Sequence, residues 1–321
     1  MLKNQGTRNS VDRYVKNYHI PIDAEVTEDM ILAHWELEKR LTKELLESNS
    51  ENRWEVFERG YTTLYSELDW LNRLQGTAIT IPPSRRYRNW VSLIGQLPNR
   101  TYEVGSGKGE LITYLTSYGF ECKGTELTHE RTQQWVSGDP NLSWAITNGI
   151  HLDQFERPNS YDIVISDQVI EHLHPDDLCE HFKGVMSILS NGGSYVFGTP
   201  HRHAGSYDVS GVFRCDKTKG MHLKEYTYAE LKQLLAQAGF EYIYAVLRIP
   251  TSSTILTTVG NLLGPMAKPR TSRTYLAYLS VVEKLISLLP RQGLRRKAAW
   301  LARCISFSPI IFMAAKKNAI W

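Results

Sequence analysis

The sequence predicts an α/β fold in which helices cover both faces of a mostly parallel β-sheet. From about residue 101 onward, short apolar segments of strand length alternate with segments whose apolar residues recur at helical spacing. Pro82 and Pro83 separate this region from an N-terminal stretch that shows only the helical pattern. Because alternating strands and helices build a parallel sheet, a ligand site is expected beyond the carboxyl ends of the strands.

Seven strands and at least four helices follow from the alternation. The expected strands are residues 101–104, 121–126, 143–147, 161–166, 194–198, 241–247 and 309–315. The clearest helices between them are residues 110–117, 129–136, 175–189 and 227–238. We therefore expect residues 91–321 to form one main domain.

Residues 1–90 are expected to form a helical lid or substrate-binding region. Leu37, Leu41 and Leu45 are four residues apart, as on one face of a helix. Large aromatic side chains in this stretch are expected to pack mainly in its core. These aromatic residues are Trp35, Trp54, Tyr61 and Tyr65.

Residues 252–304, before the last strand, interrupt the alternation. This segment carries nine Lys and Arg residues and one acid, Glu283. Residues 275–289 within it have apolar side chains at helical spacing, so a basic amphipathic helical insertion is predicted. Such an insertion can cover the active site, form a dimer contact, or lie on an anionic membrane or a lipid-linked substrate. The sequence leaves these three explanations open.

Composition and charge narrow the class of protein. With 321 residues, 42% hydrophobic, the chain can bury one substantial core plus an accessory part. A formal net charge of only +3 gives no reason to expect a nucleic acid partner. The four cysteines form no CxxC pair, and there is no apolar run typical of a signal peptide or a membrane span. A cytoplasmic protein, at most peripherally bound to membranes, is expected, and its oligomeric state stays open.

A glycine loop follows the first predicted strand. The acid Glu103 precedes three alternate glycines, Gly105, Gly107 and Gly109, which lead into a predicted helix. Glycine allows a backbone to turn tightly and to approach a ligand closely. A dinucleotide-binding loop has the spacing GxGxxG, whereas the spacing here is GxGxG. The loop therefore indicates an adenosine ligand and argues against a nicotinamide dinucleotide.

Several motifs carry a family resemblance. ExGxGxG after the first strand resembles the first motif of class I methyltransferases that depend on S-adenosylmethionine (SAM). YDIVISDQVIEHLHPDD at 161–177 resembles the fourth motif of the ubiquinone-biosynthesis type of these enzymes, and residues 190–200 resemble their fifth strand. The resemblance covers about residues 95–250 and the last strand. It implies a Rossmann-like seven-stranded sheet, SAM as methyl donor and S-adenosylhomocysteine as product.

A narrower resemblance points to a bacterial subgroup with a helical N-terminal extension. QVIEHLHPDD, TPHRHAGSYDVSGVF and GMHLKEYTYAEL are similar to that subgroup, whose members act on diverse acceptors. The chain has His201 where relatives often have Asn, and Tyr207 at the position of their usual His. Acceptor specificity is therefore not inherited from the resemblance.

The resemblance also implies the residues that bind SAM. Glu103 would lie near the amino-acid portion of the ligand, and Glu126, at the end of the second strand, can accept hydrogen bonds from both ribose hydroxyls. Asn148 stands where relatives usually have an acid that holds adenine, although an ordinary Asn-Gly turn is the alternative. The expected cofactor-binding residues are Glu103, Gly105, Gly107, Gly109, Glu126, Asn148, Gly149, Asp167 and Gln168.

The loop after the fifth strand supplies the candidates for catalysis. Methyl transfer to a hydroxyl needs a proton acceptor, and histidine suits neutral pH. His222 is the first candidate base, because it precedes a helix at the rim of the expected site, and His201 is the second; the alternative for His222 is a role in ordering its loop. Arg202 can also pair with Asp208 to shape this loop. The expected substrate-binding residues are Arg202, His203 and Tyr207.

Glu171 and His172 raise the question of a metal. Carboxylate and imidazole groups are competent metal ligands. Some quinone-pathway relatives use a further Glu three residues earlier, whereas this chain has Gln168 there. No metal is therefore expected, and the pair is interpreted as polar residues near the cofactor.

The predicted activity is transfer of a methyl group from SAM to a hydroxyl, in preference to an amine or carbon. The expected acceptor and partner is a small metabolite, natural product or glycan. Two alternatives stay open: a nicotinamide-dependent oxidoreductase, which shares the glycine loop and a ribose-binding acid, and a non-catalytic SAM-binding partner subunit.

Overall fold

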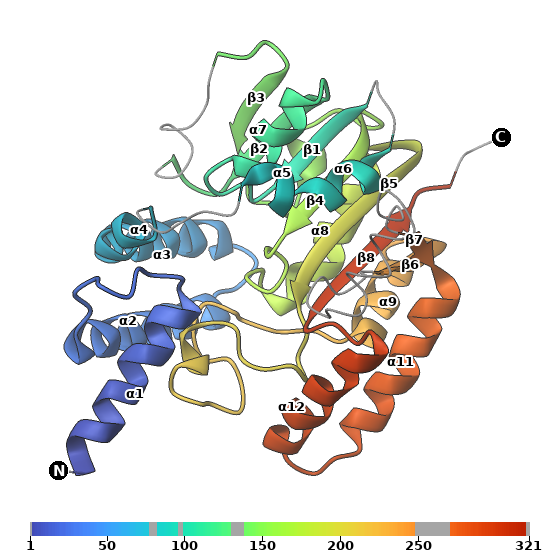
Figure 1. Cartoon of the computed structure of the whole chain (residues 1–321). Helices are drawn as coiled ribbons and strands as arrows, with labels where there is room; N and C mark the ends of the chain where they lie inside the picture. The colour runs from blue at the N-terminus through green and yellow to red at the C-terminus, as the bar shows by residue number, and fades with distance from the viewer. Residues whose placement is uncertain (1, 77–81, 96–98, 130–137, 248–269, 319–321) are drawn as a thin grey trace.

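The computed structural model describes residues 2–76, 82–95, 99–129, 138–247 and 270–318 (Figure 1). The expected helix at 129–136 and the first part of the expected insertion, up to residue 269, fall almost entirely outside these residues.

One mixed β-sheet forms the centre of the described chain. Its strands are β1 (Arg100–Val104), β2 (Glu121–Glu126), β3 (Leu142–Ile146), β4 (Tyr161–Asp167), β5 (Leu189–Pro200), β6 (Tyr242–Leu247), β7 (Arg270–Ser272) and β8 (Ile310–Lys316). They lie in the order β3-β2-β1-β4-β5-β8-β6-β7. β1 to β5 pair in parallel, whereas β8 is antiparallel to both β5 and β6. The seven predicted strands are therefore present; six have bounds within one residue of those predicted, whereas β5 begins five residues before and ends two residues after the predicted 194–198.

β7 is an additional, eighth strand that the sequence did not predict. It pairs antiparallel with β6 at the edge of the sheet, within the segment expected to be a helical insertion. Three residues are too few to show the alternation of apolar and polar positions on which a strand prediction depends.

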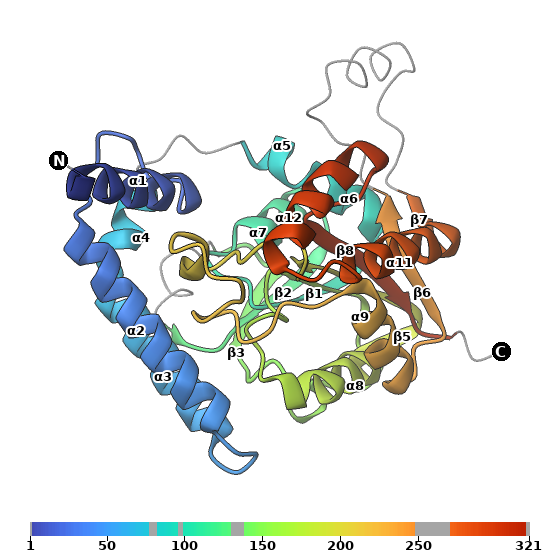
Figure 2. The same ribbon diagram turned by 90° about the horizontal axis from the view of Figure 1, so that it is seen from below.

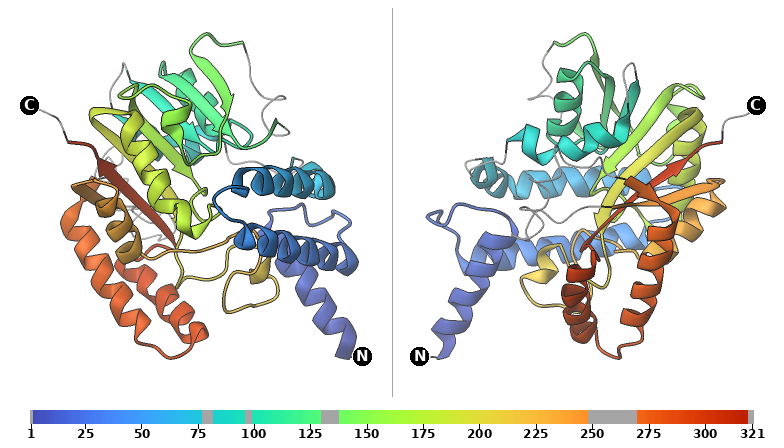
Figure 3. Two further views of the ribbon diagram at one scale, coloured as in Figure 1. Left: turned by 180° about the vertical axis from the view of Figure 1, so that it is seen from behind. Right: turned by 45° about the vertical axis from the view of Figure 1, so that its right-hand side comes forward.

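Helices cover both faces of the sheet (Figures 1 and 3). Side chains alternate between the faces along each strand. In β4, Ile163 and Ile165 pack in a cluster with α6 and α7, whereas Val164 packs in another with α8, α9 and α11. The covering helices are α5 (Pro83–Arg86), α6 (Arg88–Ile94), α7 (Glu110–Ser117), α8 (Leu178–Ile188), α9 (Tyr228–Gln237), α11 (Arg273–Ser287) and α12 (Gln292–Leu301).

Four N-terminal helices form a separate layer beside the sheet (Figure 2). They are α1 (Leu2–Asn17), α2 (Glu28–Glu47), α3 (Arg53–Glu67) and α4 (Asp69–Gly76). Leu41 and Leu45 of α2 are buried, as their spacing predicts, in a cluster that also contains Val209, Val212 and Met221 from the segment after β5. This cluster holds the N-terminal helices against the segment that follows β5.

Short 3-10 turns complete the described elements. They are η2 (Leu152–Gln154), η3 (Pro175–Asp177), η4 (Val209–Gly211) and η5 (Ala302–Ile305). The expected helix at 175–189 is therefore divided into η3 and α8. None of the helices among the described residues combines the length and apolar character needed to cross a membrane.

Candidate active site

A cavity of about 960 Å³ lies between the carboxyl ends of the central strands and the N-terminal helices. The glycine loop after β1 lines one part of it, and aromatic residues of α3 line another. Its volume is at the upper end of the range for small-molecule pockets, roughly 300–1,000 Å³. The cavity therefore has room for two ligands side by side.

The glycine loop needs its glycines for steric reasons. Gly105, Gly107 and Gly109 all have a positive φ, between 58° and 71°. A Cβ atom on Gly105 would lie 2.6 Å from a methyl group of Val169. Gly105 and Gly107 line the cavity, whereas Gly109 does not: it is the N-cap residue of α7 and lies against Trp144. Of the three glycines, Gly109 thus shapes the backbone at the start of α7 and does not line the cavity.

Glu103 is a buried carboxylate that lines the cavity. It is 3% exposed, and its Oε2 has no hydrogen-bond partner among the described residues. Burial, which outweighs the hydrogen bond from Ser106, raises the pKa of this carboxyl to about 8. A buried acid facing a cavity is best matched by a cationic ligand group, such as the amino group of SAM.

The ends of the next strands bring the other expected cofactor residues to the same cavity. Glu126, at the end of β2, accepts hydrogen bonds from the backbone amides of Gly107 and Leu127. Asn148 Oδ1 accepts hydrogen bonds from the amides of Ile150 (2.9 Å) and His151 (3.0 Å). This oxygen therefore closes the Asn-Gly turn that was the alternative to a contact with adenine. The remaining expected residues that line the cavity are Gly149, Asp167 and Gln168.

His222 lines the same cavity from the segment after β5. It is 9% exposed, and its Nδ1 donates a hydrogen bond to Glu225 Oε1 at 3.3 Å. Burial alone would lower the pKa of His222, but the hydrogen bond to Glu225 and the charges of Glu171 and Asp208 outweigh it and raise the pKa to about 9. His222 therefore carries a proton at neutral pH in this arrangement.

Glu171, His172 and His222 form a compact group at the cavity, which His172 and His222 line. One ligand atom from each lies within 4.8 Å of the other two. Thr199 donates a hydrogen bond to Glu171 Oε2 at 2.8 Å, while Glu171 Oε1 has no partner among the described residues. Burial raises the pKa of Glu171 to about 7. A carboxylate and two imidazoles at this separation can share a proton or hold a divalent ion.

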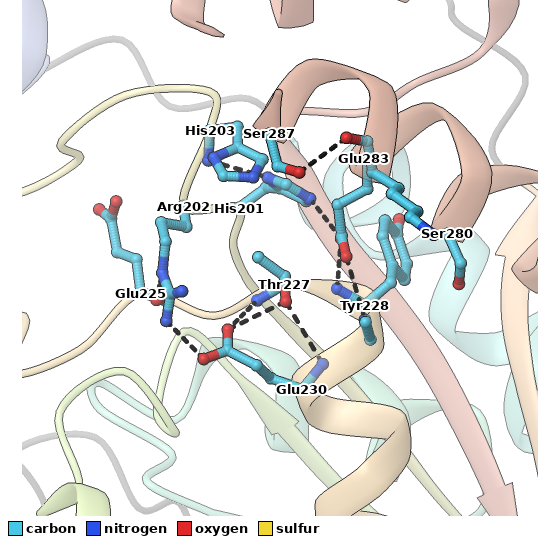
Figure 4. Close-up of polar contacts among 12 residues, drawn as sticks. His201, Arg202, His203, Glu225, Thr227, Tyr228, Glu230, Ser280, Glu283 and Ser287 are labelled. Atoms are coloured by element: carbon cyan, nitrogen blue, oxygen red, sulfur yellow. Dashed lines mark hydrogen bonds and ion pairs between the residues drawn. The ribbon is translucent and has the colours of Figure 1, made fainter. Parts of the chain in front are cut away.

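His201 lies outside the cavity, in the network of Figure 4. It is fully buried; its Nε2 donates to Glu283 at 3.0 Å, and its Nδ1 accepts from the backbone amide of His203 at 3.0 Å. Both ring nitrogens are therefore engaged, and no nitrogen is left to accept a proton from a substrate. The structure does not bring this second candidate base to the expected site.

Arg202 and His203 also lie away from the cavity lining. Arg202 forms an ion pair with Glu230 at 2.7 Å and donates to a backbone carbonyl (Figure 4), so the alternative pairing with Asp208 is wrong. Burial lowers the pKa of His203 to about 4, so it is neutral. Of the three expected substrate-binding residues, only Tyr207 lines the cavity.

Among the residues of the N-terminal helices that line the cavity are Tyr61, which the sequence indicated mainly as a core aromatic residue, and Glu38, which it did not single out. Tyr61 is 9% exposed, lies with its ring centroid 6.3 Å from that of His172, and has a hydroxyl without a partner among the described residues. Glu38 accepts hydrogen bonds from His34 (2.7 Å) and from the amide of Met221 (3.1 Å). The sequence could have indicated Glu38, because this acid and a histidine four residues before it interrupt the apolar face of α2.

Comparison with protein families identifies the fold and the chemistry. A family model described as a methyltransferase domain matches residues 83–245, just over half of the chain. The chain belongs to this methyltransferase family. It is an enzyme that uses SAM as methyl donor, which excludes the oxidoreductase alternative. Glu103 and the glycine loop fit that donor.

Solved structures of similar fold come from several organisms. A SAM-dependent methyltransferase from Archaeoglobus fulgidus is 18% identical over 73% of this chain and 92% of that chain, with a TM-score of 0.48. The 1,6-didemethyltoxoflavin-N1-methyltransferase of Burkholderia thailandensis is 14% identical over 84% of this chain and 91% of that chain, with a TM-score of 0.49. Phosphoethanolamine N-methyltransferase 2 of Haemonchus contortus is 16% identical over 72% and 52%, with a TM-score of 0.43. No curated protein matches the sequence.

Proposed function

We propose that this methyltransferase acts on a hydroxyl group of a small, partly apolar molecule held between the glycine loop and the N-terminal helices. The observation that carries the proposal is that one cavity is lined by Glu103, by His222 and by the α3 residue Tyr61. When bound, SAM supplies a methyl group on a positively charged sulfur. The protein contributes by holding an acceptor oxygen in line with that group and away from water.

We propose that the cofactor half of the cavity is formed by the ends of β1, β2 and β4. The Glu103 carboxylate would bind the amino group of the donor, and Glu126 the ribose hydroxyls. Asn148 and Gly149 would flank the adenine, with Asp167 and Gln168 closing the site below. This assignment is supported by the shared cavity and by the buried, unpartnered oxygen of Glu103.

The acceptor half is bounded by His222, Tyr61 and Tyr207, with an apolar wall from α3 and α4. The residues of that wall are Phe57, Leu64, Leu68 and Leu71. An apolar wall with few convergent polar groups suits an acceptor that is largely apolar and carries a hydroxyl. The unpartnered hydroxyl of Tyr61 is available to bind the acceptor's polar group.

We propose that His222 is the base, and that it becomes one as the pH rises. Because the pKa of His222 is raised to about 9, the imidazole is charged at neutral pH and accepts a proton only when that charge is lost. Turnover of a hydroxyl acceptor is therefore expected to increase with pH up to about 9. Glu225, Glu171 and Asp208 raise the pKa of His222, and the ring of His172 also faces it.

The test is to incubate the enzyme with labelled SAM and a cell extract and to determine the mass and structure of the methylated product. With the acceptor in hand, His222→Gln is expected to reduce kcat by roughly 100-fold or more and to remove the alkaline rise, with SAM affinity unchanged. His203→Gln, outside the cavity, is the matched control.

Three results would contradict parts of the proposal. A methylated amine or carbon would refute the hydroxyl acceptor. An unchanged pH profile in His222→Gln would remove the base assignment, and loss of turnover on chelation with recovery on adding Mn²⁺ would assign the Glu171, His172 and His222 group to a metal instead.

A further inference from the structure

The helix α11 has two apolar faces, and the core of the protein uses only one of them. Its inner face is buried against the sheet and α9 through Leu276, Leu279, Val282 and Ile286. Its outer face carries a second apolar row at spacings of three and four residues. That row is Tyr278, Val281, Leu285 and, just after the helix, Leu288.

The outer row is strongly exposed and continues onto the next elements. Leu285 is 62% exposed and Leu288 73%. The hydroxyl of Tyr278 donates to the carbonyl of Ile305 at 2.9 Å, which joins the row to the end of the α12 and η5 segment. That segment adds the exposed side chains Leu294, Trp300, Leu301 and Ile305. We call these eight side chains of α11, α12 and η5 the hairpin patch.

The hairpin patch is a concentration of apolar surface without parallel in the rest of the described chain. Fourteen large apolar side chains are exposed among the described residues, and eight of them belong to the patch. α11 and α12 form an antiparallel pair beside one end of the sheet (Figures 1 and 3). Exposed apolar patches of this kind mark interaction surfaces.

The charged side chains that α11, α12 and their connecting residues expose are all of one sign. Glu283 is the sole acid between residues 270 and 318, and it is buried in contact with His201 and the start of α9 (Figure 4). The exposed basic side chains of the same elements are Arg273, Lys284, Arg291, Lys297 and Arg303. The apolar side chains of the patch are therefore accompanied on their own elements by exposed cations alone, although the whole chain has a net charge of only +3.

We propose that the hairpin patch docks on an anionic lipid surface. Apolar side chains flanked by Lys and Arg insert at the boundary between headgroups and acyl chains, and Trp and Tyr favour that depth. Each basic residue near an anionic bilayer contributes about 1 kcal/mol, which corresponds to roughly fivefold in affinity. A second copy of the chain fits less well, because a two-fold contact through the patch would bring the cationic side chains of both copies together.

The patch is mechanically connected to the segment that lines the acceptor half of the cavity. Gln292 of α12 donates to the carbonyl of Arg202 at 2.8 Å, and Arg296 donates to the carbonyl of Cys215. Glu283 of α11 is bound to His201 (Figure 4). These contacts anchor both helices to the 201–226 segment, which also supplies Tyr207 and His222. A lipid surface at the patch would therefore be held in a fixed relation to the active site.

Co-sedimentation of the intact protein with vesicles tests the proposal. The protein is expected to sediment with phosphatidylcholine vesicles that contain phosphatidylglycerol at low ionic strength, and to be largely released by high salt. Vesicles of phosphatidylcholine alone should retain little of it. Leu285→Glu combined with Leu288→Glu is expected to weaken binding by roughly tenfold or more, since these side chains are 62% and 73% exposed.

A matched control is available in α2. Leu32 and Leu46 are each 43% exposed on a surface distant from the hairpin patch, and the double change Leu32→Glu with Leu46→Glu should leave vesicle binding unchanged. Arg291→Glu combined with Lys297→Glu tests the electrostatic contribution to vesicle binding. This double variant should bind anionic vesicles more weakly than the unchanged protein at low salt, and the difference should disappear at high salt. Thermal melts and SAM binding of every variant should match those of the unchanged protein.

Several outcomes would overturn the proposal. These are failure of the intact protein to sediment with anionic vesicles at low salt, equal sedimentation of the Leu285 and Leu288 double variant, and a concentration-dependent dimer that this double variant abolishes. The vesicle measurements need no acceptor, so they can fail while the proposed methyl transfer to a hydroxyl stands, and the reverse also holds.

Discussion

At the scale of single residues, the cofactor site contains a carboxylate whose burial is unfavourable until a ligand binds. The pKa of Glu103 is about 8 in the folded protein, against an ordinary value of 4.5. A carboxyl with a raised pKa binds more protons in the folded chain than in the unfolded chain, so the ligand-free protein loses stability as the pH rises from 4.5 toward 8. At pH 7 this loss is up to about 3 kcal/mol.

Glu103→Gln is therefore expected to have two opposite effects. It should raise the melting temperature of the ligand-free protein at pH 7 to 8, because a neutral amide is buried without the free-energy cost of protonating a carboxylate. It should also weaken SAM binding by roughly 10- to 100-fold, because a hydrogen bond from a cationic amino group to a carboxylate is lost. Thermal melts and calorimetry with SAM measure both effects.

The exposed Glu121, at the start of β2, provides the control. Glu121→Gln should change neither the melting temperature nor the affinity for SAM. Undiminished SAM binding by Glu103→Gln would show that this carboxylate does not contact the donor.

The structure brings predicted site residues to one cavity where they are close in the sequence. Glu103 and the glycines Gly105 and Gly107 were expected at one ligand site because loop and strand are contiguous, and they line one cavity. His201 and Arg202 were misplaced because their partners, Glu283 and Glu230, are 82 and 28 residues away. No local pattern reveals such partners.

At the scale of elements, Glu283 connects three segments that are distant in the chain. It lies on α11, receives a hydrogen bond from His201, and accepts hydrogen bonds from the amides of Tyr228 (2.6 Å) and Ala229 (3.2 Å) in the first turn of α9 (Figure 4). These amides have no partner within their own helix, and an acid at a helix N-terminus is also stabilised by the helix dipole. Glu283 thereby holds α9, α11 and the segment after β5 together.

We predict that Glu283→Ala lowers the free energy of unfolding by about 3 kcal/mol, because it leaves buried donors without acceptors. The adjacent and exposed Lys284→Ala should change it by less than about 0.5 kcal/mol. Urea denaturation gives both values. A loss for Glu283→Ala no larger than that for Lys284→Ala would show that the network contributes little.

Elements were predictable from the sequence where they span several periods of the hydrophobic pattern. α7 has the predicted bounds, and α11 differs from its predicted bounds by two residues at each end. β7 was too short to be predicted. The exposed second face of α11 could not be predicted, because the sequence does not distinguish an apolar residue that faces the core from one that faces the surface.

At the scale of the whole molecule, the N-terminal helices and the segment after β5 behave as one packed unit. The hydroxyl of Thr42 donates to the carbonyl of Gly220, and the rings of Trp35 and Phe213 stack with centroids 4.8 Å apart. Val209 and Met221 lie in the same apolar cluster as α2 and α3. We propose on this basis that residues 1–90 serve as a lid that completes the acceptor half of the cavity.

The lid proposal predicts a specific effect of Trp35→Ala. Removal of an aromatic pair and of the area it buries weakens the contact between α2 and the 201–226 segment, without touching the cofactor half of the cavity. Amide hydrogen exchange should therefore become faster in both α2 and residues 209–221 but not in β1 or β4, and KM for the acceptor should rise several-fold while SAM affinity stays constant. Trp300→Ala, which removes an exposed tryptophan from α12, is the control and should change neither quantity in the absence of lipid. If exchange quickened in α2 alone, the two segments would not form one unit, and the lid would have to be held by other contacts.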